Sequence, residues 1–152
     1  MKTFTRSITM LAFAALSFSQ AQAADNSASK TNLAQLQGTW SMVSGIADGQ
    51  ALPDVMVGQA RRVCTNDEIT VTIGEQMIMK AKITLDATKK PKTIDFQMTD
   101  GVNKGKRQLG IYELDGDTLK FCFAGPGAER PTDFTAKADS GRTLSVWKRA
   151  TK

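Results

Sequence analysis

Short segments in which apolar and polar side chains alternate constrain the fold of this chain more than any other feature. Ile69, Val71 and Ile73 alternate with threonines, and the same pattern returns in residues 77–85, 94–98 and 119–123. Successive side chains of a β-strand point to opposite faces, so this period predicts strands with one buried and one solvated face. Asp115-Gly116 stands between two such segments and is typical of a two-residue hairpin loop.

The spacing of these segments predicts an antiparallel meander. The expected strands are 37–45, 60–65, 68–73, 76–85, 92–98, 107–114, 117–123, 132–138 and 142–149. Residues 53–58 begin with Pro53 and end with Gly58, which predicts one short helix. We therefore expect an all-β fold, an antiparallel up-and-down meander barrel of eight to nine strands, because closure removes exposed strand edges. A two-sheet sandwich is the alternative.

Residues 1–23 have the features of a secretory signal peptide. Lys2 and Arg6 precede an apolar run over residues 8–18, and Ala21-Gln22-Ala23 forms a small-residue cleavage site. The apolar run is shorter than the ~20 residues that span a bilayer, so an uncleaved anchor is the weaker interpretation. We expect export to the periplasm or the medium, a flexible lead over residues 24–35, and one domain over residues 36–152.

The residue inventory argues against an enzyme. The chain has no histidine and two cysteines. This excludes His-based nucleophilic triads and imidazole acid–base catalysis, and two sulfurs alone do not make the usual zinc site. No carboxylate pair, glycine-rich phosphate loop or nucleophile elbow marks an active site. We therefore expect no catalytic residues, no metal and no cofactor.

Positive charge is concentrated in one part of the chain. Residues 80–107 carry eight basic and three acidic side chains. The stretch lacks interleaved exposed aromatic residues, so nucleic acid is not an expected partner. We interpret the lysines as solvated strand faces and loop tips, with an anion site as the alternative.

The start and the end of the predicted barrel resemble the lipocalins. Gly38-Thr39-Trp40 opens the first strand, as the Gly-x-Trp triplet does in that family. The resemblance implies that Trp40 plugs the closed end of the barrel and that a basic residue of the last strand covers its ring. Lys148 and Arg149 are the two candidates for that residue.

A second resemblance covers nearly the whole exported part. The chain resembles an uncharacterised secreted domain family abundant in planctomycete bacteria, which is itself similar to lipocalins in fold. The matching blocks are residues 36–40 (LQGTW), 48–50 (DGQ), 89–95 (KKPKTID), 110–117 (GIYELDGD), 121–124 (FCFA) and 127–131 (GAERP). The resemblance implies no particular activity, and Cys64 departs from the family's pattern.

The alternation places several large side chains on the predicted inner face. These candidates for a ligand-binding lining are Met77, Met79, Phe96, Met98, Tyr112 and Phe121. A barrel of about eight strands is either filled by its side chains or wide enough for one small ligand, so the same residues fit an ordinary core. Tyr112 either presents its hydroxyl as a polar group inside a cavity or is a core residue whose hydroxyl forms a hydrogen bond with the backbone.

Two function classes follow from this pattern. The first is a monomeric binding protein for a small apolar or amphipathic molecule, held in the barrel. The second is an envelope protein-interaction or inhibitor module with a filled barrel and no small-molecule ligand.

The two cysteines are expected as free thiols. Cys122 alternates with the inward-facing Phe121 and Phe123, so it is expected to face outward. Val63 is expected to face inward, which places the adjacent Cys64 on the outer face as well. Two outward sulfurs on non-adjacent strands do not reach the geometry of a disulfide. A bulge at Arg61-Arg62, or a sandwich, would change this expectation.

Overall fold

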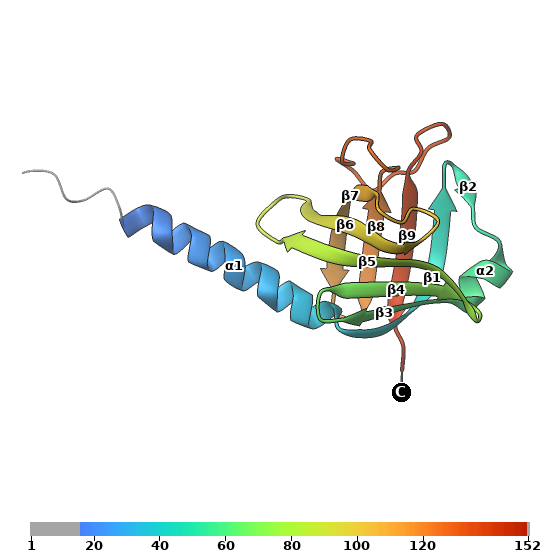
Figure 1. The fold of residues 1–152 in the computed structure, drawn as a ribbon, viewed down its shortest axis with the longest axis horizontal. Helices are drawn as coiled ribbons and strands as arrows, with labels where there is room; N and C mark the ends of the chain where they lie inside the picture. The colour runs from blue at the N-terminus through green and yellow to red at the C-terminus, as the bar shows by residue number, and fades with distance from the viewer. Residues whose placement is uncertain (1–15, 152) are drawn as a thin grey trace, which may run out of the picture.

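The strands close into a barrel. The computed structural model describes residues 16–151. Its elements are α1 (Leu16–Leu36), β1 (Gly38–Ala47), β2 (Gln50–Ala51), α2 (Asp54–Gln59), β3 (Ala60–Thr65), β4 (Glu68–Ile73), β5 (Gln76–Asp86), β6 (Lys92–Gly101), β7 (Arg107–Asp115), β8 (Thr118–Phe123) and β9 (Thr143–Arg149) (Figure 1). Each strand from β3 to β9 pairs antiparallel with the next, β1 pairs with β3, and β9 pairs back onto β1. β2 is a short addition that pairs only with the end of β1.

The predicted fold class is confirmed: eight strands close the barrel, and the ninth is the short β2 and not the expected strand at 132–138. Residues 132–138 form no strand; they belong to the connection between β8 and β9, which crosses the outer face of the barrel. Ile111 and Cys122 on that face are buried, and the Cys122 sulfur contacts the Thr135 carbonyl of this connection. The predicted short helix is α2, which begins directly after Pro53.

The polar lead is helical, so the expectation of a flexible segment at 24–35 was wrong. These residues form part of α1, and their alanines, glutamine and lysine favour a helix. The last turns also gain partners on the barrel: Asn32 and Leu36 are buried, and the Ser29 hydroxyl accepts a 3.2 Å hydrogen bond from the Ala87 amide. Over residues 16–151, no helix combines the length and the apolar character that a membrane crossing needs. The charged start of the predicted signal peptide lies outside the described residues.

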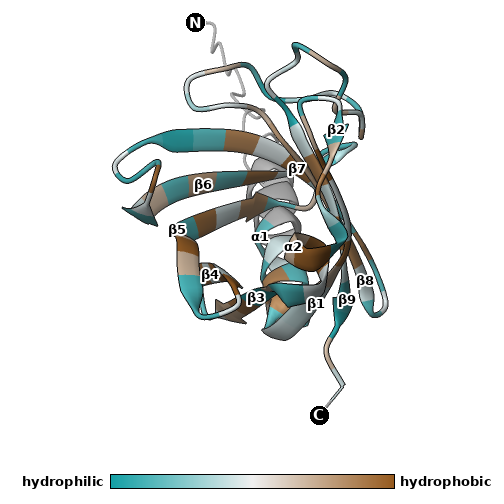
Figure 2. Ribbon diagram, turned by 90° about the vertical axis from the view of Figure 1, so that its right-hand side faces the viewer, coloured by the Kyte–Doolittle hydropathy of each residue, from teal (hydrophilic) through white to brown (hydrophobic). Residues whose placement is uncertain are grey.

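The two helices lie at opposite ends of the barrel. Figure 1 shows α1 at one end of β3 and β4, and α2 near the other end. We call the end covered by α1 the closed end, and the opposite end the mouth. Hydrophilic and hydrophobic bands alternate along β5 and β6 in Figure 2, as expected for strands with one dry face.

The inward phase of β3 differs from the prediction. Ala60, Arg62 and Cys64 face the interior, whereas Val63 is 40% exposed on the outside. The register explains the difference, because Arg62 lies directly opposite Trp40 on β1. Residues opposite each other in an antiparallel pair share a face, and Trp40 is buried.

Both cysteines are free and buried. Cys122 faces outward as predicted, although the β8–β9 connection covers it and its sulfur contacts the Thr135 carbonyl at 3.4 Å. Cys64 faces inward, which corrects the outward placement expected from the sequence. The thiols therefore lie on different sides of the barrel wall.

Candidate functional site

Aromatic side chains fill the middle of the barrel. Phe96, Phe121 and Phe123 form one cluster, with the Phe96 and Phe123 centroids 4.3 Å apart and those of Phe121 and Phe123 5.4 Å apart. Met98 and Trp147 are buried in the same core. Phe96, Met98 and Phe121 therefore lie together in the interior, as the alternation predicts.

Trp40 and Arg149 close one end of this core. Trp40 is fully buried, and the guanidinium carbon of Arg149 lies 4.3 Å from its ring centroid. The Trp40 indole donates to the Leu36 carbonyl at 2.9 Å, and Arg149 donates to the carbonyls of Gln35 and Gln37. The two side chains thus satisfy carbonyls that the end of α1 leaves open. Of the two basic candidates, Arg149 covers the ring and Lys148 is exposed.

Tyr112 belongs to the closed end and not to the mouth. Its ring is buried, and its hydroxyl donates a 3.0 Å hydrogen bond to Asn32 Oδ1 on α1. Lys92 Nζ donates to the same oxygen at 3.1 Å. Burial raises the pKa of Tyr112 well above its usual value, and the Asp86 charge adds to this. Tyr112 is therefore a neutral hydrogen-bonding group that fastens α1 to β7.

The mouth is lined by apolar side chains that remain partly exposed. Met42, Ile73, Met79 and Phe123 come from four different strands and pack against the buried core below them. We call these four residues the mouth ring. The sequence names Met79 as a lining residue. Its alternation also places Ile73 and Phe123 on inward faces without naming them as part of a site, and it misses Met42, which precedes a bulge in β1.

Met77 lies outside the barrel, contrary to its predicted place on the inner face. Val71 pairs with Met79 but the adjacent Thr72 pairs with Met77, so Ile78 is an extra residue in β5. Such a bulge shifts the phase of the side chains by one. Met77 is accordingly 37% exposed, whereas Met79 packs on the core.

Arg62 is the unusual residue of the interior. Its side chain is 3% exposed, and its guanidinium carbon lies 4.1 Å from the Phe121 centroid and 4.7 Å from that of the Trp147 ring. Nε and Nη1 are buried without a hydrogen-bond partner in the described part of the chain. Most buried polar groups in proteins are hydrogen-bonded, so these two donors require an explanation.

Within residues 16–151, no acidic side chain forms an ion pair with Arg62. The buried polar or charged residues of the described chain are Asn32, Arg62 and Ser145. Desolvation lowers the pKa of Arg62 to about 9, while the neighbouring Cys64 raises it slightly. The guanidinium is therefore charged at neutral pH, and cation–π contacts with Phe121 and Trp147 replace only part of its hydration.

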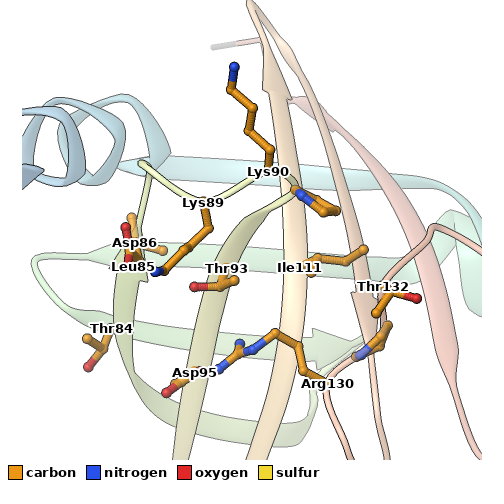
Figure 3. Close-up of a pocket in the computed structure, with 12 residues that line it drawn as sticks. Thr84, Leu85, Asp86, Lys89, Lys90, Thr93, Asp95, Ile111, Arg130 and Thr132 are labelled. Carbon is orange, nitrogen blue, oxygen red and sulfur yellow. Dashed lines mark hydrogen bonds and ion pairs between the residues drawn. The ribbon is translucent and has the colours of Figure 1, made fainter.

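A hollow lies on the outer wall of the barrel. The groove measures about 660 Å³ and runs over β5, β6 and β7 beside Arg130 and Thr132 (Figure 3). Arg130 Nη2 pairs with Asp95 Oδ1 at 2.6 Å, and Arg107 binds the other oxygen of the same carboxylate. Arg130 Nη1 also donates to the Ile94 and Gly110 carbonyls. These contacts pair the half-buried Arg130 and Asp95 with groups of the chain itself and hold the β8–β9 connection against the barrel.

Comparisons with known protein families, curated proteins and solved structures find no match to this chain. The resemblances to the lipocalins and to the planctomycete domain family therefore stay predictions of ancestry. The closed barrel itself stands on its strand pairing alone.

Sequence reasoning missed Arg62 because a charged residue is rarely placed in a core. The available signal was the pair of small apolar residues in phase with it, Ala60 and Cys64, against Arg61, Val63 and Thr65 in the other phase. Two of three positions in the first phase are apolar, which favours the phase that the structure shows.

Proposed function

We propose that this protein is an exported binding protein that holds a small amphipathic molecule at the mouth of its barrel. The observation that carries the proposal is the mouth ring: four apolar side chains, left partly exposed above an aromatic interior. Partly exposed apolar surface of this kind favours burial of an apolar group from water.

The mouth ring is also adaptable. Two of its four members are methionines, and Met98 lies buried beneath them. Methionine has three rotatable bonds and a polarizable sulfur, so it adjusts to guests of different shape. The interior around Phe96 and Phe121 is packed, so a guest enters by displacing methionine side chains.

Export is part of the same proposal. A cut after Ala23 falls inside α1, six residues before Ser29, which makes the first side-chain hydrogen bond of this helix to the barrel; Asn32 makes the next. Removal of the leader therefore leaves the closed end intact. The site of action would be the periplasm or the medium.

The second candidate function is an envelope protein-interaction module. Exposed apolar residues on the outer face of β1, Val43 at 54% and Ile46 at 36%, favour it. This candidate needs no ligand at the mouth, so an experiment that measures binding of an apolar dye there separates the two candidate functions.

Two methionines of β5 provide a matched test of the mouth. Nile red, a neutral apolar dye, should bind the wild-type protein one to one. Met79→Lys places a charge in the mouth ring and should weaken dye binding by at least about tenfold. Met77→Lys, on the outside of the same strand, should bind the dye as the wild type does.

Near-ultraviolet circular dichroism establishes that both variants are folded. If the folded wild-type protein does not bind the dye, or if the two variants bind it equally, the mouth is not a binding site. The interaction module then becomes the better account of the fold.

A further inference from the structure

We propose that the molecule bound at the mouth carries a carboxylate, and that Arg62 is the residue that selects it. This inference rests on the proposed binding function and names the chemical class of the ligand. The guanidinium lies within the core that the mouth ring covers, next to Phe121 and Trp147. An apolar chain in the ring would therefore have its polar end within the barrel, where Arg62 is the cation.

The first argument is the missing partner. Leaving a charged group buried and unpaired is among the more destabilising arrangements in a protein. The remaining buried polar residues of the described chain, Asn32 and Ser145, are already engaged, with Tyr112 and Lys92 in one case and with the Trp147 indole in the other. The protein itself thus supplies no anion to Arg62 in its described part.

The second argument is the geometry of the donors. A guanidinium offers two bidentate edges, Nε with Nη2 and Nη1 with Nη2, and each edge contains one of the unpartnered nitrogens. A planar carboxylate matches either edge with two parallel hydrogen bonds. An uncharged hydroxyl would leave the positive charge uncompensated.

The third argument is the contrast with the outer groove. There Arg130 and Arg107 both pair with the Asp95 carboxylate, although their side chains are more exposed than that of Arg62. Arg149 likewise pairs with Asp117 at 3.0 Å. Arg62 is the most buried of these four arginines, and it is the one without an acidic partner in the described residues.

The test compares two ligands that differ only at the head group. Octanoate and 1-octanol are titrated calorimetrically into the wild type, Arg62→Met and Arg61→Met. Arg61 is the adjacent residue, exposed on the outer face, and serves as the matched control. The Trp147 fluorescence gives a second readout, since this ring contacts the guanidinium.

We expect octanoate to bind the wild type and Arg61→Met alike, and to bind Arg62→Met at least about tenfold more weakly. The affinity for 1-octanol should be the same in all three proteins. Methionine fills a similar volume without charge, so Arg62→Met should fold, and circular dichroism checks this.

Four results would overturn the inference. If Arg62→Met binds octanoate like the wild type, Arg62 does not select the head group. If it loses octanoate and 1-octanol equally, Arg62 acts only through the shape of the interior. If the wild type binds 1-octanol as tightly as octanoate, the carboxylate is irrelevant while the proposed binding function stands; if it binds neither ligand nor Nile red, both proposals fail.

Discussion

Arg62 and Phe121 face each other across the barrel interior, with the guanidinium carbon 4.1 Å from the ring centroid. The pair joins β3 to β8, which are not neighbours in the sheet. A cation in this position is stabilised by the ring, yet it keeps two nitrogens without hydrogen-bond partners. The interior therefore combines a well-packed aromatic core with one costly group, an arrangement typical of functional sites.

Replacing Arg62 should stabilise the free protein. Arg62→Met removes a buried, unpaired charge and keeps apolar volume, so the free energy of unfolding should rise by about 1–4 kcal/mol. Urea unfolding measures this, with Arg61→Met as the control that should change stability little. A loss of stability in Arg62→Met would mean that the cation–π contacts outweigh the cost of burial.

Trp40 should be the most sensitive core position at the closed end. Its ring is fully buried and its indole donates to the Leu36 carbonyl, so Trp40→Ala should lower the free energy of unfolding by about 3–5 kcal/mol. Thermal or urea unfolding of the variant gives the value. A loss below about 1 kcal/mol would be typical of a surface residue and would show that Trp40 is not a plug.

Arg149 and Lys148 offer a matched pair on the last strand. Arg149→Met uncovers the Trp40 ring and leaves the Gln35 and Gln37 carbonyls without their donor, which should cost about 1–2 kcal/mol. Lys148→Met, at an exposed position, should be close to neutral. Equal effects of the two changes on urea unfolding would contradict the role of Arg149 at the end of α1.

The thiols should react only after unfolding. Burial raises the pKa of Cys64 and of Cys122, which lowers the thiolate fraction at neutral pH in addition to blocking access. Native protein should therefore resist iodoacetamide, and unfolded, unreduced protein should take up two labels per chain. Unfolded monomer without any label would reveal a disulfide and refute the strand order.

The exported form should begin at Ala24. Residues 1–23 have the charged start, apolar run and small-residue exit of a signal peptide. Intact-mass measurement of protein recovered from the envelope fraction should match residues 24–152. A mass that includes the leader would refute both cleavage and this part of the localisation.

The barrel could be predicted from the sequence because its physical cause is local. A few neighbouring residues suffice to predict each element: alternation predicts β4, β6 and β8, and Asp115-Gly116 predicts the hairpin turn. The contact of Trp40 with a basic residue of the last strand was expected from the resemblance to the lipocalins, and Arg149 makes that contact.

The residues of the mouth could be predicted only in part, because the pairing between strands decides which side chains face inward. The bulge at Ile78 separates Met77 from Met79, and the register opposite Trp40 turns Arg62 inward. The bulge has no local signal in the chain, and the only local signal for Arg62 is that Ala60 and Cys64 share its phase. Residues 24–36 show the same limit, since their helix is held by contacts with Ala87, Lys92 and Tyr112, which lie far along the sequence.

The most direct measurement follows the Arg62 side chain itself during ligand binding. In nitrogen–proton correlation spectra, the Nε–H signal of Arg62, assigned by its loss in Arg62→Met, should move on addition of octanoate. It should stay in place on addition of 1-octanol, and the Nε–H signal of Arg61 should stay in place with both. An Arg62 signal unmoved by saturating octanoate, with shifts elsewhere on the barrel, would contradict a carboxylate site at the mouth.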